Sequence, residues 1–546
     1  MTTYRLEIHH KDYSSWRLID ETNNKPVEVG SINPIQDKLF DQDILDDKFV
    51  LSQRSVKLNK IPGILLLEGN KTYGRHKNRL LYKCIPHNKH LPVFLVPYEL
   101  KIGFSKHFQN KYVLFSYDSW DTKHPYGLLD ETIGDVNLLT NTSRYLLHCN
   151  DLVYSHKKIQ KKIGKIDYDT TLMDIVEKHN VETLEHKNIF SIDPLGSKDL
   201  DDAMSIDQVS ETKYIVRIYI ANVLLWIDCL DLWEELTNQP STIYLPNEKK
   251  SMLPNILGDQ FCSLLEKQKK LVQVFEFCIE NNNVNKAESK IYNALVTIKK
   301  NYVYDEEKLQ SNKHYSLLEE LTQNITSHYM DSHEVVSYWM VEANKWMADT
   351  LHNNEKGIYR TAHYSELPTD VSLEHKDVIQ TYLHTHSQYM LYKHDGLTHS
   401  VMREDKYVHV TSPIRRMVDI CNQYYFQLIT NNEVSLKAFL FMNRIEDMID
   451  DMNAILKKIK KVQNQMNLLS GVETHNIDLN KEFKGVIIDK DTGEEYNEYQ
   501  VFIPELSLFQ QVRSNEIKEI YDDVLVKMYY LQDEYITYKK IRCQMI

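Results

Sequence analysis

Short apolar segments alternate with turn residues over the first third of the chain. Runs such as FVLSQRSVKL, GILLLEG and PVFLVPYEL are separated by Gly, Pro, Asn and Asp. Segments of this length and spacing are typical of small β-barrels, although a plain β-sandwich gives the same pattern. We expect one or two barrels over residues 51–155, preceded over residues 1–50 by an arm or a few strands.

The pattern changes character three times after residue 155. SHKKIQKKIGK is rich in lysine and TTLMDIVEKHN has helical spacing, so residues 156–186 are predicted as a linker that contains a helix. Over residues 187–475 strand-like segments such as KYIVRIYIANV precede long helical patterns, which predicts an α+β body. Apolar and polar residues alternate again over residues 476–546, which favours another small barrel.

Composition narrows the class of protein only slightly. A chain of 546 residues with 42% hydrophobic residues can bury several cores, and a net charge of −13 leaves room for a local basic channel that binds nucleic acid. The seven cysteines are dispersed without a CxxC pair, and neither a signal peptide nor a membrane-spanning run is apparent. We therefore expect an intracellular, cytoplasmic protein with reduced thiols.

Four carboxylates crowd into one short stretch, FSIDPLGSKDLDDAMSI, at residues 190–206. Two unit charges about 4 Å apart repel by roughly 4 kcal/mol at an effective dielectric near 20, so a folded chain needs a cation or solvent between them. Carboxylate oxygens suit Mg²⁺, Mn²⁺ and Ca²⁺. Pro194 and Gly196 predict a turn that folds the stretch back on itself. The carboxylates are Asp193, Asp199, Asp201 and Asp202.

A calcium-binding EF-hand does not explain this cluster. Counted from Asp199, the positions of Ala203, Met204 and Ser210 should hold an oxygen ligand, a glycine and a bidentate glutamate. The spacing alone leaves two interpretations open, namely metal-dependent phosphoryl chemistry and a solvated acidic loop.

A family resemblance favours the first interpretation. The pattern I-D-P-x-G-x-x-D-x-D-D-A at residues 192–203 resembles the signature of the RNase II/RNB exoribonucleases, in particular the eukaryotic exosome-nuclease branch. YLPN, MLP, CSL, VYDEE, DSHEVVSYWMVEAN, GIYRTAH and YVHVTSPIRRMVDI follow in the family's order. The resemblance implies a multidomain α+β chain with a central RNB catalytic domain, N-terminal cold-shock/OB-like β-barrels, a C-terminal S1-like β-barrel and no PIN endonuclease domain.

The same resemblance implies an activity and a set of site residues. Such enzymes are Mg²⁺-dependent (Mn²⁺ is an alternative) 3′→5′ exoribonucleases that hydrolyse single-stranded RNA to nucleoside 5′-monophosphates. The four aspartates would hold the metal, Asp201 and Arg415 would be catalytic, and we expect a monomer whose partner is single-stranded RNA. The residues that would contact RNA are Tyr244, Tyr304, Arg360, His409, Ser412 and Arg416.

Several positions depart from the family's pattern, and none of them is one of the four aspartates. The departures indicate a divergent enzyme, with a viral origin as one interpretation, and they keep open a catalytically weak or inactive RNA-binding protein of the RNB fold. They are Ser337 and Tyr338 in place of paired glutamates, Tyr219 and Asn222 in place of His and Asp, Gln423 and Tyr424 in place of His-Arg, and Lys270 in place of Arg.

Overall fold

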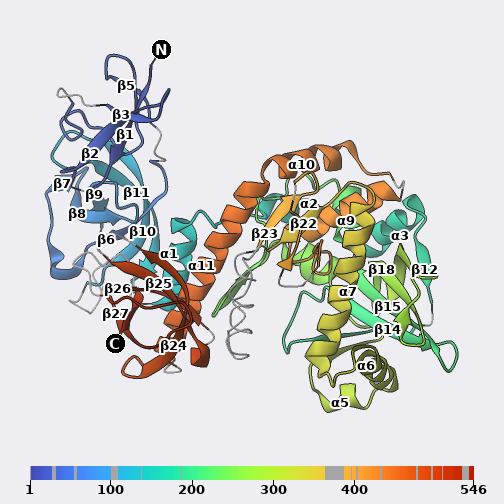
Figure 1. Ribbon diagram of the computed structural model, residues 1–546. Coiled ribbons are helices and arrows are strands. Elements are labelled where there is room, and N and C mark those ends of the chain that lie inside the picture. The colour runs from blue at the N-terminus through green and yellow to red at the C-terminus, as the bar shows by residue number, and fades with distance from the viewer. Residues whose placement is uncertain are drawn as a thin grey trace.

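β-Rich domains lie on one side of a long helix and a mixed α/β body lies on the other in this computed structural model (Figure 1). The long helix is α11 (Ile449–Glu473), and none of the helices within the described part of the chain is long and apolar enough to cross a membrane. The structure describes every residue except 1, 11, 28–31, 55–57, 100–107, 137, 186, 363–386, 395, 401–403, 431–432, 475–476, 493–495, 507 and 532–539.

The N-terminal fifty residues contribute strands, one of the two options that the sequence left open. They pair in the order β3-β2-β1-β4-β5, and the apolar face of this sheet buries Leu6, Leu18 and Leu45. The strands are β1 (Tyr4–Ile8), β2 (Trp16–Asp20), β3 (Lys25–Val27), β4 (Ile44–Leu45) and β5 (Leu51–Gln53).

A closed barrel follows, as the alternating pattern predicts. Strand β6 pairs with both β10 and β8, so the order β6-β10-β11-β9-β8 returns to its start, and β9 and β11 run parallel. This is the strand arrangement of an OB-type barrel, and Tyr82, Phe94 and Phe115 fill its interior. The elements are β6 (Ile61–Leu65), η1 (Glu68–Asn70), β7 (Arg75–His76), β8 (Arg79–Pro86), β9 (Phe94–Tyr98), β10 (Lys111–Ser119) and β11 (Tyr126–Asp135).

Residues 156–186 belong to the central body instead of forming a free linker. The lysines face outward, but Ile159, Ile163, Leu172 and Ile175 are buried in the main core. Strand β12 also joins the central sheet beside β20, so the segment is tied down at both ends. The elements here are α2 (Lys157–Ile163), α3 (Tyr168–Lys178) and β12 (Glu182–Leu184). The preceding helix, α1 (Leu139–Cys149), packs instead against β6, β10 and β11 of the barrel and against α11.

The central body is built on a sheet with the order β12-β20-β18-β15-β14-β13-β21. Its strands are β13 (Phe190–Asp193), β14 (Asp202–Gln208), β15 (Lys213–Ala221), β18 (Lys269–Glu280), β19 (Asn283–Val284, paired with β18), β20 (Lys290–Thr297) and β21 (Lys300–Val303). Outside it lie two small pairs, β16 (Ile243–Leu245) with β17 (Glu248–Lys250) and β22 (Ile358–Thr361) with β23 (Gln388–Leu391).

Helices cover this sheet through large aromatic contacts, for example Trp339 of α7 against Phe277 of β18 at 5.5 Å between ring centres. The helices are α4 (Val223–Cys229), η2 (Ile256–Cys262), α5 (Glu307–Gln310), α6 (Lys313–Thr326), α7 (Ser332–His352), α9 (Met417–Ile429) and α10 (Leu436–Asp447).

The C-terminal strands form the second predicted small barrel. Their order is β26-β25-β24-β27-β28, and β26 also lies against β28. The barrel shares a core with α11, in which Val462 and Met466 pack with Phe483 and Val501. The predicted α+β organisation with β domains on both flanks is therefore confirmed. The elements are β24 (Glu482–Thr492), β25 (Asn497–Ile503), η4 (Pro504–Leu506), β26 (Leu508–Ser514), β27 (Asp523–Tyr530) and β28 (Ile541–Met545).

Candidate active site

The acidic stretch forms a loop between two adjacent strands. Asp193 ends β13 and Asp202 begins β14, which runs antiparallel to it, so the two carboxylates lie at the same edge of the sheet. Gly196 adopts φ +85° in the turn between them, a conformation that side chains rarely adopt. The loop thus folds back as Pro194 and Gly196 predict, and we call residues 193–202 the acid loop.

A buried serine clamps the acid loop to the residues that follow η2. The Ser263 hydroxyl accepts a hydrogen bond from Leu200 N–H (3.1 Å) and donates one to the Lys198 carbonyl (2.8 Å), on either side of Asp199. The Leu264 N–H adds a bond to the Leu200 carbonyl (2.9 Å). The motif CSL is therefore the support of the loop, a role that the sequence alone did not indicate.

Asp201 meets a segment more than two hundred residues downstream. Its Oδ1 accepts a hydrogen bond from Ile414 N–H (2.8 Å), and its Oδ2 lies 3.1 Å from Arg415 Nε. Asp201 is 1% exposed, and burial raises the pKa of its carboxyl to about 7 although Arg415 opposes the shift. The structure thus brings together the two residues that the resemblance implies to be catalytic.

The remaining aspartates differ sharply in their surroundings. Burial raises the pKa of Asp193 to about 6, and burial together with the neighbouring Asp193 and Asp201 raises that of Asp202 well above its ordinary value. Oδ2 of Asp193 is buried without a hydrogen-bond partner among the described residues. Burial acts on Asp199 in the same direction, but the hydrogen bond from Tyr244 and the Lys249 ammonium outweigh it and lower its pKa.

The hairpin of β16 and β17 supplies both contacts to Asp199. Tyr244 Oη donates to Asp199 Oδ2 (2.7 Å), and Lys249 Nζ lies 3.2 Å from Asp199 Oδ1 and 3.7 Å from Asp259 Oδ1. Tyr244 was predicted from the sequence as a site residue, whereas Lys249 was not. The two residues are directly opposite in the hairpin, so they share a face, and this pairing is the signal that could have identified Lys249.

Arg416 is held in place by a buried carboxylate. Its Nη2 donates to Asp419 Oδ2 (2.8 Å), which also accepts the Ser412 N–H (2.7 Å). The Ser412 hydroxyl in turn accepts a hydrogen bond from Arg415 Nη2 (3.0 Å). Ser412 and Asp419 therefore fix the turn that carries both arginines, and Asp419 was not among the predicted site residues.

Arg360 and His409 line a basic cavity of about 750 Å³ between the central body, α11 and the C-terminal barrel. The Arg360 guanidinium lies 4.6 Å from the centre of the Tyr389 ring, and the hydroxyl of Tyr389 is 2.7 Å from His409 Nδ1. Burial, with Arg416 nearby, holds the pKa of His409 well below its ordinary value, so the imidazole is neutral. The cationic residues of the cavity are Arg360, Arg416, Lys457, Lys460 and Lys461.

Tyr304 contacts the acid loop at Asp193, where the loop begins. Its N–H donates to the Asp193 carbonyl (3.3 Å), and its ring stacks on His333 with 3.6 Å between ring centres. Ser337 and Tyr338, two of the departures, follow His333 by one helical turn on α7 and help to line a hollow of about 490 Å³. Ser337 and Tyr338 are therefore connected to Tyr304 through His333, which lines the same hollow and stacks on the Tyr304 ring.

Other departures are internal structural contacts. The Tyr219 hydroxyl bonds Ser205 Oγ (2.8 Å), Asn222 accepts the Leu225 N–H at the start of α4 (3.2 Å), and Gln423 Nε2 donates to the Ala221 carbonyl (2.8 Å). These side chains satisfy buried polar groups and do not contact the acid-loop carboxylates.

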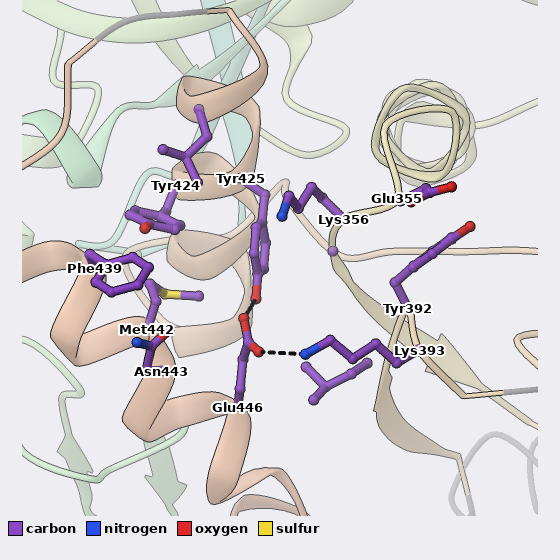
Figure 2. Close-up of a pocket in the computed structure, with 13 residues that line it drawn as sticks. Glu355, Lys356, Tyr392, Lys393, Tyr424, Tyr425, Phe439, Met442, Asn443 and Glu446 are labelled. Atoms are coloured by element: carbon purple, nitrogen blue, oxygen red, sulfur yellow. Dashed lines mark hydrogen bonds and ion pairs between the residues drawn. The ribbon is translucent and has the colours of Figure 1, made fainter.

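Tyr424 lines a separate pocket of about 240 Å³ between α9, α10 and β23 (Figure 2). In that pocket the Tyr425 hydroxyl donates to Glu446 (2.6 Å), and Lys393 lies 3.6 Å from the same carboxylate. None of the acid-loop residues lines it.

A divalent cation fits the acid loop only in part. Within the described ranges, no group of three or more His, Cys, Asp or Glu side chains is arranged to hold a metal ion by itself. Asp193 and Asp202 nevertheless fit a cation, because Oδ2 of Asp193 is buried without a hydrogen-bond partner among the described residues and burial raises the pKa of both carboxyls, which a nearby positive charge would offset. Mg²⁺ commonly takes one or two protein carboxylates and completes its shell with water and substrate phosphate.

The fold and this loop define a protein with an RNB domain. Residues 181–314 match the RNB domain family, so the predicted resemblance is confirmed over these residues, which carry the acid loop and most of the central sheet.

Two curated proteins are similar to this chain over regions longer than the family match. Over 259 residues the chain is 26% identical to Ribonuclease R of Mycoplasma genitalium, which covers 44% of this chain and 33% of that protein. Over 163 residues it is 26% identical to the exosome complex exonuclease RRP44 of Mus musculus, which covers 29% of this chain and 16% of that protein. The aligned regions span a third or less of these relatives.

Solved structures share the whole fold. The apo form of Mycoplasma genitalium RNase R matches with a TM-score of 0.70 at 17% identity over 100% of both chains, and its complex with ribose-methylated single-stranded RNA matches with 0.69 at the same identity and coverage. Yeast Ssd1, a pseudonuclease, matches with 0.59 at 15% identity over 89% of this chain and 69% of that one.

Proposed function

We propose that the protein is a 3′→5′ exoribonuclease that hydrolyses single-stranded RNA to nucleoside 5′-monophosphates with Mg²⁺ or Mn²⁺. The observation that carries the proposal is the convergence of Asp201 and Arg415, with 3.1 Å between Oδ2 and Nε, on a loop of four carboxylates. Related RNB proteins named as ribonucleases and exonucleases support the same activity.

In this proposal the metal-holding residues are Asp193 and Asp202, with Asp199 and Asp201 beside them. When bound, the cation supplies charge that stabilises the phosphate oxygens and acidifies a water. Arg415 is suited to hold the scissile phosphate because its Nη2 is already oriented by Ser412 and its guanidinium can present two donors.

The basic cavity is the proposed path of the RNA strand. Its lysines and arginines can neutralise successive phosphates, which gives affinity without sequence preference. In this proposal Tyr244 and Tyr304 stack on bases near the acid loop, and base–aromatic stacking contributes roughly 1–3 kcal/mol per base. We propose a monomer that acts in the cytoplasm.

One assay tests the proposal directly. Incubation of the protein with 5′-labelled single-stranded RNA and Mg²⁺ should shorten the RNA from its 3′ end and release 5′-monophosphates. Asp201→Asn should abolish the shortening because it removes the charge that faces Arg415. Absence of shortening with the wild-type protein would refute the nuclease proposal, and equal rates in both proteins would refute the site.

A catalytically weak or inactive RNA-binding protein is the second candidate. Two observations favour it: Ser337 and Tyr338 stand where the family has paired glutamates, and a pseudonuclease shares the fold. The same assay separates the candidates when RNA binding is measured in parallel. Tight binding without shortening would establish the second candidate.

A further inference from the structure

The acid loop is balanced by two protein cations that contact different carboxylates. Arg415 Nε lies 3.1 Å from Asp201 Oδ2, and Lys249 Nζ lies 3.2 Å from Asp199 Oδ1. The two cations come from separate parts of the chain, the turn before α9 and strand β17. Asp193 and Asp202 have no ion pair with any cation in the described part of the chain.

Three contacts fix Lys249 in this position: its own ion pairs with Asp199 and Asp259 and the hydrogen bond of its hairpin neighbour Tyr244 to Asp199. Its ammonium also lies 3.7 Å from Asp259 Oδ1 of η2, and the paired Tyr244 donates to the other oxygen of Asp199 (2.7 Å). The Lys249 side chain is 25% exposed and those of Asp199 and Asp259 are 12% and 17% exposed. The ammonium is therefore a largely desolvated positive charge with a defined place, unlike a surface lysine.

This arrangement affects how many divalent cations the loop can bind. Both oxygens of Asp199 are engaged, one by an ammonium and one by a phenol. A divalent cation at Asp199 would face a fixed like charge in a site with little water, where repulsion is strong. Oδ2 of Asp193, by contrast, is buried and has no hydrogen-bond partner among the described residues, so it is available to a cation.

Many phosphodiester hydrolases use two metal ions that flank the scissile phosphate. We propose that the Lys249 ammonium takes the place of a second divalent cation on the Asp199 side of the acid loop, so that the protein binds one divalent cation, held by Asp193 and Asp202. The effect of Lys249 on the Mg²⁺ dependence of the rate rests on the proposed nuclease function. The number of bound ions can be measured whether or not the protein is active.

The test counts Mn²⁺ bound to the full chain, with free Mn²⁺ measured by electron paramagnetic resonance. The wild-type protein should bind one ion, and Lys249→Met should bind two because the positive charge is gone. Lys249→Arg keeps the charge and should bind one. The matched control is Lys250→Met, which removes the neighbouring lysine, paired with Glu248 at 2.6 Å, and should also leave the count at one.

Two ions in the wild-type protein, or one ion in Lys249→Met, would overturn the proposal. Circular dichroism checks that each variant is folded, and Lys249→Gln replaces Lys249→Met if the latter does not fold. If the wild-type protein shortens RNA, its rate should depend on Mg²⁺ with a Hill slope near one, and Lys249→Met should raise the slope toward two. Absence of RNA shortening together with the expected ion counts would refute the nuclease function and leave this inference standing.

Discussion

Replacing Ser263 by alanine should disable the acid loop while leaving the fold intact. The lost hydroxyl is fully buried and connects the Leu200 N–H to the Lys198 carbonyl, the backbone groups that flank Asp199. The bond from the Leu264 N–H to the Leu200 carbonyl remains, so the loop stays attached on one side.

The magnitude follows from these contacts. A buried backbone N–H without an acceptor costs about 1–3 kcal/mol, so the free energy of unfolding should fall by that amount. The freed loop also carries Asp201 away from Arg415, and a misplacement of about 1 Å between reacting groups costs on the order of 100-fold in rate. We expect kcat to fall by about 10- to 100-fold with a smaller change in KM, because Tyr304 and the basic cavity are untouched.

Single-turnover shortening of 5′-labelled RNA and chemical denaturation measure the two effects. The matched control is Ser205→Ala, which deletes an equally buried hydroxyl on β14, three residues beyond the acid loop, that is bonded to Tyr219 at 2.8 Å and not to the loop backbone. The control should lose stability but keep its rate. Equal losses of kcat in both variants, or a loss of stability alone in Ser263→Ala, would refute the positioning role.

Three further predictions concern pH, stacking and charge. Burial raises the pKa of Asp193 to about 6 and of Asp201 to about 7, above the ordinary 3.8, so the metal-free fold holds these protons more tightly than the unfolded chain. Its free energy of unfolding, measured by urea titration, should therefore fall by a few kcal/mol as pH rises from about 4 to 7. Mg²⁺ should raise the free energy of unfolding more at pH 8 than at pH 5, because more of the carboxylates are then ionised. A stability that does not change with pH would contradict the raised pKa values. Tyr304→Leu should weaken single-stranded RNA binding by roughly 1–3 kcal/mol in fluorescence anisotropy, whereas Tyr329→Leu, at a residue 82% exposed, should not. Lys460→Gln in the basic cavity should lower the salt dependence of RNA binding by about 0.7 in the log–log slope, and an unchanged slope would remove Lys460 from the strand path.

Much of the fold was predictable because its signals are local. Alternation of apolar and polar residues marked the strands of both flanking barrels, since period-two patterning needs only neighbouring residues. Residues 156–186 show where this logic failed. Their lysines suggested a solvated linker, but Ile159, Ile163, Leu172 and Ile175 pack into the main core. The segment has a lysine-rich face and an apolar face, and only the packed structure shows that the apolar face fixes it to the central body.

Some residues of the candidate site were predictable from the sequence and others were not. The motif with Arg415 was found through the family resemblance, whereas Lys249, Asp259, Ser263 and Asp419 were missed. Lys249 and Ser263 act on the acid loop from 50 and 63 residues away in the chain, which no local pattern shows. Asp259 and Asp419 hold the nearby cations Lys249 and Arg416, and their roles appear only once those cations are placed beside the acid loop. The lysines at 457, 458, 460 and 461 are exposed on α11, and three of them also line the basic cavity, which forms only when α11 packs between the central body and the C-terminal barrel.

The sequence by itself determined that four carboxylates share ten residues and that a turn at Pro194 and Gly196 folds them together. Only the tertiary structure decided what balances each charge. Lys249 and Arg415 neutralise Asp199 and Asp201 from 50 and more than 200 residues away, while Asp193 and Asp202 form no ion pair with any residue that the structure describes. Desolvation and Coulomb interactions depend on distance in space, and these distances exist only once the sheet, the hairpin and the turn before α9 have packed together.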